Sequence, residues 1–291
     1  MRYTFDKFKA EFPDDAACLD AIMDVQYGGT EFECPACHKG SKFHRISKRR
    51  AYSCQFCGHH IYPCVGTPFE NSRTKLHHWF FAMYLLTSTR HGVAAKEIER
   101  QLGVTYKCAW RICHELRKLM ATADFQGPLS GAVEIDETRV GGKTAMKRKN
   151  ANKTVVMGMV ERDGNLRAAP IPTVSKAALQ DAILKNVRPG SVLMTDEWIG
   201  YEGIKEKGPF HHLRVNHSAG EYVRGPVHTN TIEGYWSRLK NSIRGTHVHV
   251  SQKHLWKYVS EFSFRFNNRK EPAAMFSRLL AACALPRLAD A

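Results

Sequence analysis

The stretch Ala132-Val-Glu-Ile-Asp-Glu-Thr-Arg-Val140 decides the fold of the larger part of the chain. It has the character of a β-strand, yet it contains three acids, and acids are poor strand formers. Because a strand alternates its side chains between two faces, Glu134 and Asp136 share one face and Glu137 takes the other. We therefore interpret the stretch as a strand whose acids serve a site rather than the core.

A second acid follows the short apolar run Val192-Leu-Met-Thr195. The run predicts a buried strand with Asp196 at its carboxyl end, where α/β sheets build their sites. Glu197 follows directly, but the two-residue period of a strand lets only one of the pair face the site, which favours the aspartate. Two aspartates at strand ends are suited to binding a divalent cation together.

The third candidate acid lies in Asn230-Thr-Ile-Glu-Gly-Tyr-Trp-Ser-Arg-Leu-Lys240, which predicts a helix. Glu233 and Lys240 are seven residues apart, about two helical turns, so both side chains lie on one face about 10 Å apart along the axis. A structural alternative is a capping box, with Asn230 as the N-cap and Glu233 three residues later. The fragment alone leaves both interpretations open.

Short runs around these acids predict a mixed sheet. A helical lead-in over residues 1–30 comes first in the chain, and 154–160 and 166–171 flank the hairpin turn Asp163-Gly164. The remaining expected elements are a helix over 175–186, strands over 191–195 and 211–216, and helices over 231–243 and 253–266. Strands followed by helices in this order indicate an α/β domain.

Two cysteine pairs, Cys34-Pro-Ala-Cys37 and Cys54-Gln-Phe-Cys57, are separated by 16 residues. This spacing predicts two knuckles that hold one tetrahedral Zn²⁺ through four thiolates. A redox dithiol is the alternative, but the pairs lack a surrounding βαβ pattern. Four thiolates leave no open coordination position, so the ion would be structural. The basic loop between the knuckles is either a phosphate contact or a solvated ribbon tip.

A proline-free segment after the knuckles predicts helices over 94–102 and 106–120, joined by Gly103-Val-Thr105. This is the outline of a helix-turn-helix, although many helical hairpins do not bind DNA. Apolar spacing turns Ala109, Ile112, Leu116 and Leu119 inward on the second helix. The side chains left to contact DNA are Tyr106, Lys107, Arg111, His114 and Lys118.

The charge of the chain indicates a polyanionic partner. Lysine and arginine outnumber aspartate and glutamate by 43 to 28, which gives a net charge of +15 and a pI of about 9.5. The basic segment 143–153 contains Lys147, Arg148 and Lys149, which we expect either to follow a DNA backbone or to form a solvated hairpin. No apolar run is long enough for a membrane span and no signal peptide is evident, so we expect a cytoplasmic protein.

The order of the acids resembles that of the DDE transposases, with 60 residues from Asp136 to Asp196, 37 to Glu233 and seven more to Lys240. The resemblance is closest to the bacterial insertion-sequence branch with an N-terminal zinc ribbon, and it covers nearly the whole chain. Beside the cysteine pairs, its carriers are Val133-Glu-Ile-Asp-Glu-Thr-x-Val-Gly-Gly-Lys143, Thr195-Asp-Glu-Trp-x-Gly-Tyr201, His228-Thr-Asn-Thr-Ile-Glu-Gly-Tyr-Trp236 and Glu261-Phe-x-Phe-Arg-Phe-Asn-Asn-Arg269.

The resemblance implies a ribonuclease-H-like catalytic domain in which Asp136, Asp196 and Glu233 bind two Mg²⁺ or Mn²⁺ ions. It also implies that Lys240 contacts the transposon end. Some members of this branch have asparagine at the third acid, so His228 and Asn230 stay as alternatives there. His38 stands where a glycine is more usual in the first knuckle, which puts the local turn in doubt but leaves the zinc prediction unaffected.

The activity implied is metal-dependent cleavage at transposon ends followed by strand transfer into target DNA. A DNA-binding regulator, or a remnant with an idle catalytic fold, is the alternative from another class. We expect a zinc ribbon within residues 1–70, a helix-turn-helix-like module over 71–123 and the catalytic domain over 131–280. On its DNA, on the bacterial chromosome, the protein is expected to assemble as a homo-oligomer.

Overall fold

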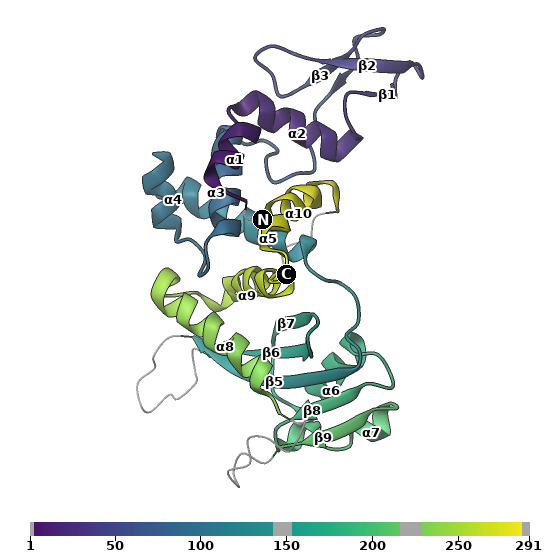
Figure 1. Cartoon of the computed structure of the whole chain (residues 1–291), viewed down its shortest axis with the longest axis vertical. Coiled ribbons are helices and arrows are strands. Elements are labelled where there is room, and N and C mark those ends of the chain that lie inside the picture. The colour runs from purple at the N-terminus through teal and green to yellow at the C-terminus, as the bar shows by residue number, and fades with distance from the viewer. Residues whose placement is uncertain (1–2, 142–152, 216–227, 287–291) are drawn as a thin grey trace. The chain divides into compact units, whose positions relative to one another are not determined.

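The computed structural model divides the chain into two units, and it describes residues 3–141, 153–215 and 228–286 (Figure 1). Unit 1 contains the described residues up to Ala123 together with those from Glu271 onward. Unit 2 runs from Asp124 to Lys270. In the described part of the chain, no helix combines the length and the apolar character that a membrane span requires.

Unit 1 begins with the predicted helical lead-in, which forms α1 (Phe5–Glu11) and α2 (Asp15–Tyr27). Asp14 caps α2 by accepting hydrogen bonds from two backbone amides of its first turn, each at 2.9 Å. A four-stranded antiparallel sheet follows in the order β1-β2-β3-β4. Its strands are β1 (Glu31–Glu33), β2 (Gly40–Arg45), β3 (Tyr52–Cys54) and β4 (His60–Ile61).

The helices of unit 1 pack around α5. They are α3 (Leu76–Ser88), α4 (Ala95–Leu102), α5 (Tyr106–Ala123) and α10 (Met275–Ala281), with the short turns η5 (Pro272–Ala274) and η6 (Ala282–Ala284) beside α10. α4 and α5 match the predicted helical hairpin. α3 has no side-chain cap of its own. Instead, the carboxylate of Asp15 accepts hydrogen bonds from the backbone amides of Leu76 at 3.1 Å and His77 at 2.9 Å.

The segment from Glu271 onward belongs to unit 1 because α10 packs against α2, α3 and α5. The catalytic domain predicted from the sequence continues to residue 280 instead. A seven-residue helix carries no local sign of which core it joins. The three-part division of the chain into 1–70, 71–123 and 131–280 stays a prediction.

Unit 2 is built on a five-stranded sheet in the order β7-β6-β5-β8-β9. β6 is antiparallel to both β5 and β7, whereas β8 is parallel to both β5 and β9. The strands are β5 (Ala132–Gly141), β6 (Lys153–Glu161), β7 (Leu166–Ile171), β8 (Val192–Thr195) and β9 (His211–Arg214). The Asp163-Gly164 turn joins β6 to β7 as predicted.

Helices cover both faces of this sheet, as the period-two pattern of β5 requires. The even-numbered face of β5 looks toward α8 (Asn230–Ser242), and α8 and α9 (Gln252–Asn267) share one apolar core with the sheet. Val133 and Ile135, on the odd-numbered face, share a second core with α6 (Lys176–Asn186). The other elements are η2 (Ile199–Tyr201), α7 (Ile204–Lys207) and η4 (Ile243–His247). The expected mixed α/β, ribonuclease-H-like architecture is confirmed.

Gly158 of β6 allows α8 to lie close to the sheet. It pairs with Asp136 of β5 in the antiparallel register. A Cβ atom at this position would come within 2.7 Å of side-chain atoms of both Ile232 and Trp236. The missing side chain therefore makes the space in which the Trp236 ring lies against the sheet, next to the strand that carries Asp136.

Candidate metal sites and DNA-facing residues

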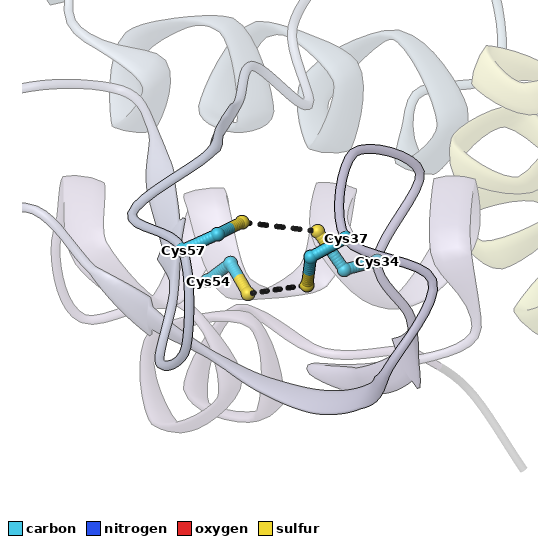
Figure 2. A group of neighbouring side chains, drawn as sticks. All are labelled: Cys34, Cys37, Cys54 and Cys57. Carbon is cyan, nitrogen blue, oxygen red and sulfur yellow. Dashed lines mark hydrogen bonds between the residues drawn. The ribbon is translucent and has the colours of Figure 1, made fainter.

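The four predicted zinc ligands come together in unit 1 (Figure 2). The sulfur atoms of Cys34 and Cys57 are 3.6 Å apart, and those of Cys37 and Cys54 are 3.9 Å apart. A tetrahedral ion with Zn–S bonds of about 2.3 Å places its ligand sulfurs about 3.8 Å from one another. The cluster therefore fits one structural Zn²⁺ held by a zinc ribbon.

Both knuckles make the same turn. The amide of His38 donates to the carbonyl oxygen of Cys34 at 2.8 Å, and the amide of Gly58 donates to that of Cys54 at 3.1 Å. Both residues have positive φ, 56° for His38 and 73° for Gly58. The turn therefore forms with histidine in the position that glycine occupies in the second knuckle, at the cost of a left-handed backbone for a residue with a Cβ.

Asp136 and Asp196 lie beside each other because their strands are parallel neighbours. Glu134 of β5 pairs with Met194 of β8, and Asp136 and Asp196 each follow two residues later in the same direction, Asp196 directly after the end of β8. Burial and then the negative charges of Glu137 and Asp196 raise the pKa of Asp136 to about 7. The acids Asp136, Glu137 and Asp196 therefore lie near one another, and repulsion between their carboxylates favours a bound proton or cation.

The neighbours of these acids have different partners. Asp136 accepts a hydrogen bond from Trp236 Nε1 of α8 at 2.9 Å, whereas Glu137 on the opposite face accepts one from the hydroxyl of Tyr201. Burial and the charge of Asp196 raise the pKa of Glu137, against the lowering effect of the Tyr201 hydrogen bond. Asp196 itself accepts from the backbone amide of Trp198 at 3.0 Å. The sequence carried no local signal of the roles of Tyr201 and Trp236.

Glu233 is exposed on α8 and does not form the predicted capping box. The N-cap is Thr229 rather than Asn230, and its hydroxyl donates to Glu233 Oε1 at 2.9 Å. The amides of Thr231 and Ile232 at the start of the helix donate to Glu134 instead, at 2.8 and 3.2 Å. The capping interpretation is therefore wrong, because a carboxylate from a distant strand takes that role. Whether Glu233 is the third metal ligand stays a prediction.

Trp236 lies between Glu233 and Lys240 on one face of α8, at helical steps of three and four. Burial lowers the pKa of Lys240, while the nearby charge of Asp136 opposes that change and the charges of Arg244 and Lys153 add to it. Lys240 is therefore close enough to Asp136 for the two charges to interact. Among the described residues, the four cysteines are the only group of three or more potential ligands whose atoms all lie within 4.8 Å of one another, so the structure does not bring Asp136, Asp196 and Glu233 together to that extent.

Of the alternatives for the third acid, His228 and Asn230 differ in their surroundings. The Nδ1 atom of His228 lies 3.2 Å from the buried carboxylate of Glu134. Asn230 is exposed at the start of α8. His228 thus contacts Glu134. This acid shares a strand face with Asp136, and the sequence did not assign it a role.

The residues predicted to contact DNA from α5 have mixed exposure. Tyr106 is half-exposed beneath Lys96, and Lys107 is exposed. Arg111 donates to Ser72 Oγ at 2.9 Å, and Lys118 pairs with Glu115 at 3.1 Å. The basic residues Lys147, Arg148 and Lys149 lie outside the described part of the chain.

The prediction that His114 faces DNA is wrong. Its side chain is 3% exposed and stacks on Trp110, with ring centroids 3.7 Å apart. α5 is contacted by α3, α4 and α10, so a wider arc of the helix is buried than its apolar spacing suggests.

Comparisons with known proteins agree with this architecture. Residues 128–267 match the model of the ISXO2-like transposase domain, and residues 13–60 match that of the transposase zinc-ribbon domain. An uncharacterized protein in transposable element ISH50 of Halobacterium salinarum is 26% identical over 262 residues, which cover 82% of this chain and 86% of that protein. An uncharacterized transposase-like protein of Haemophilus influenzae is 29% identical over 98 residues, 34% of this chain and 77% of that protein. By these matches the chain carries a transposase zinc-ribbon domain followed by an ISXO2-like transposase domain, the two domains of the DDE transposases that it resembles.

Proposed function

We propose that this protein cuts DNA at the ends of its transposon and joins those ends to target DNA. The observation that carries the proposal is that Asp136 of β5 lies near enough to Asp196, which directly follows the parallel neighbour β8, for the charge of Asp196 to raise the pKa of Asp136. Burial and the neighbouring acids make the ionised form of Asp136 unfavourable unless a cation is bound. A divalent cation between the two aspartates would relieve that repulsion.

We assign Asp136, Asp196 and Glu233 as the ligands of two Mg²⁺ or Mn²⁺ ions, because carboxylate oxygens suit these hard cations. Two such ions would activate the attacking oxygen and stabilise the leaving oxygen of a phosphodiester. Glu233 supplies its carboxylate from α8, whose face with Trp236 and Lys240 is turned to Asp136. Lys240 would hold a backbone phosphate of the transposon end.

The proposed reaction has two steps. Water attacks the phosphorus at the transposon end, the bond to the 3′-oxygen breaks, and that oxygen takes up a proton to become a free 3′-hydroxyl. The hydroxyl then loses its proton and attacks a phosphodiester of target DNA, whose own 3′-oxygen leaves. One phosphodiester bond is exchanged for another in the second step, so no nucleotide cofactor is needed.

DNA is the proposed partner throughout, in agreement with the net charge of +15. We assign DNA contacts to basic and aromatic residues of α5, among which the Lys118 side chain is only 18% exposed and pairs with Glu115, and to the segment before β6. They are Tyr106, Lys107, Arg111, Lys118, Lys147, Arg148 and Lys149. We further propose that copies of the protein assemble on the two transposon ends, in the cytoplasm and on the chromosome.

The substitution Asp196→Asn tests this proposal with DNA that carries the terminal repeats of the element. Cleavage and strand transfer should fall by at least about a thousandfold, while binding to the ends persists in a mobility-shift assay. Asp181→Asn, an exposed change on α6, is the matched control and should keep full activity. Unchanged strand transfer by Asp196→Asn would contradict the mechanism. End binding by a wild-type chain that never cleaves would indicate a DNA-binding regulator instead.

A further inference from the structure

Glu134 is an acid that the proposed reaction leaves without a role, although its side chain is fully buried in β5. It lies two residues before Asp136, so both side chains point to the face of the sheet that α8 covers. A buried carboxylate needs several hydrogen-bond donors, because burial without them is costly. Those donors come from the start of α8 and from the chain around it.

The carboxylate receives the N-terminus of α8. Its Oε2 atom accepts from the amides of Thr231 at 2.8 Å and Ile232 at 3.2 Å, and its Oε1 atom accepts from the hydroxyl of Thr231 at 2.9 Å. These amides belong to the first turn, where helix N–H groups have no partner within the helix. The positive end of the helix dipole adds to the attraction. Glu134 thus takes over the capping role from 97 residues away.

Two further groups hold the chain that leads into α8. Arg162 Nε donates to Glu134 Oε1 at 3.3 Å, and another nitrogen of the same guanidinium donates to the carbonyl oxygen of His228 at 3.4 Å. The His228 ring contacts the same carboxylate oxygen at 3.2 Å. The Glu134 side chain therefore connects strand β5 with Arg162, which follows β6, and with the residues that lead into α8.

β5 holds α8 at two points. Glu134 takes the first turn, and Asp136 takes the indole N–H of Trp236, at 2.9 Å. Each residue of an α-helix turns the chain by about 100°, so a helix held at one point alone could rotate and turn Glu233 and Lys240 away from Asp136. Two contacts on the same strand set both the rotation of α8 and its position along the strand.

We propose that Glu134 is a positioning residue of the carboxylate site: it fixes the rotation of α8 so that the face with Glu233, Trp236 and Lys240 is presented to Asp136. The proposal rests on the proposed function, because it assumes that Glu233 completes the metal site. Glu134 itself binds no metal and acts through α8.

The test measures Mn²⁺ affinity of the full-length, zinc-loaded protein from the electron paramagnetic resonance signal of free Mn²⁺. Glu134→Gln keeps the shape but sets an amide N–H₂ against helix N–H groups. Its Mn²⁺ affinity should fall at least about tenfold, as for other residues that orient metal ligands. Asp15→Asn is the matched control, because Asp15 also caps a distant helix, α3, by accepting hydrogen bonds from two backbone amides of its first turn. It should lower the melting temperature similarly and leave Mn²⁺ affinity within about twofold.

Wild-type Mn²⁺ affinity in a folded Glu134→Gln protein would overturn the proposal. If that variant does not fold, Thr231→Val, which removes one hydroxyl donor to Glu134, replaces it. Weaker Mn²⁺ binding by Thr231→Val would then support the proposal, and wild-type affinity would overturn it. Asp196→Asn separates the two hypotheses. If it too binds Mn²⁺ like the wild type, the carboxylate site itself is misassigned, whereas loss of binding in Asp196→Asn alone rejects only the role of Glu134.

Discussion

The thiolate cluster of unit 1 and the proposed carboxylate site of unit 2 are assembled in opposite ways. Each half of the thiolate cluster comes from one tight turn, and all four sulfurs lie within 4.8 Å of one another. The carboxylates come from β5, the end of β8 and α8, and each accepts a hydrogen bond from a neighbouring group. A local motif can make a structural site by itself, whereas the proposed catalytic site depends on the whole sheet and the helix packed on it.

The two sites should also respond differently to the loss of their metal ions. Four thiolates gathered at one point repel one another, and the few hydrogen bonds they receive, such as the contact of Cys54 with Ser41 at 3.1 Å, do not replace a cation, so we expect their arrangement to depend on zinc. Asp136 instead has a pKa raised to about 7 and keeps its hydrogen bond from Trp236, so a proton can take the place of a metal. Metal binding at the thiolate cluster should therefore be coupled to folding of the zinc ribbon. Metal binding at the proposed carboxylate site should instead release the proton of Asp136.

Loss of one zinc ligand should have the largest effect. Cys37→Ser should abolish stable zinc binding, which is worth about 10 kcal/mol or more in zinc-finger peptides, and the strands from β1 to β4 should lose their protection from amide hydrogen exchange. Protection across the sheet of unit 2 should be unchanged. Cys108→Ser is the control, because Cys108 lies in α5, outside the thiolate cluster, with its sulfur 3.3 Å from the hydroxyl of Thr74. A ribbon that stays protected without zinc would contradict the contrast between the two sites.

Removal of a carboxylate should stabilise unit 2 in magnesium-free buffer. The folded-state pKa of Asp136 is raised from 3.8 to about 7, so its contribution to stability is present below about pH 4 and is lost as pH rises to about 7. Asp136→Asn should therefore match the wild type near pH 4 and be more stable by about 2 to 4 kcal/mol above pH 7. Urea unfolding at several pH values measures this difference. A pH-independent difference would show that Asp136 is ionised in the folded protein at all these values.

Loss of the indole donor should shift the proton competition at the carboxylate site. The hydrogen bond from Trp236 lowers the pKa of Asp136, so Trp236→Phe should raise that pKa further. The pH at which Mn²⁺ binding is half-maximal should rise by about one unit, equivalent to about 1.4 kcal/mol. Trp256→Phe makes the same change on α9 and should leave the midpoint in place. An unshifted midpoint in Trp236→Phe would mean that its hydrogen bond does not influence Asp136.

The first knuckle should show the smallest effect. His38→Gly removes the strain of a left-handed residue with a Cβ and should stabilise the zinc ribbon by up to about 1 kcal/mol, because the exposed contact with Glu33 contributes little. Gly58→Ala, which would put a Cβ into open space at a φ of 73°, should destabilise it by a similar amount. Thermal unfolding followed by zinc release would measure both changes. Stabilisation by Gly58→Ala would contradict the strain argument.

The elements of unit 2 were predictable because their signals are local. The turn at Asp163-Gly164 and the N-cap at Ser175 are encoded within a few residues, and the predicted elements around them differ from β6 and α6 by only one residue at any end. The two aspartates were expected to bind one cation together, and the parallel pairing of β5 with β8 agrees with that expectation, although Asp136 lies in the middle of β5 rather than at its end. In contrast, α10 joins unit 1 from the far end of the chain, and no local pattern marks a contact of that range.

The surroundings of the candidate site were harder to predict. Asn230 looked like a helix cap because the N-cap pattern is counted along the chain, but the cap of α8 comes from Glu134 in another strand. The sequence placed Glu134 on the correct face without indicating a partner. His114 lay outside the predicted apolar stripe and is buried all the same, because several helices surround α5. Signals of this kind depend on tertiary neighbours, which spacing along one helix does not contain.

The space above Gly158 has a consequence for how this family can vary in evolution. A larger residue at 158 would collide with Trp236, and a smaller residue at 236 that made room for it would remove the indole donor from Asp136. The two positions are therefore expected to change together among related sequences or not at all. Where both have changed, another donor should have arisen near the first aspartate, and an alignment of relatives would reveal it as a correlated third substitution.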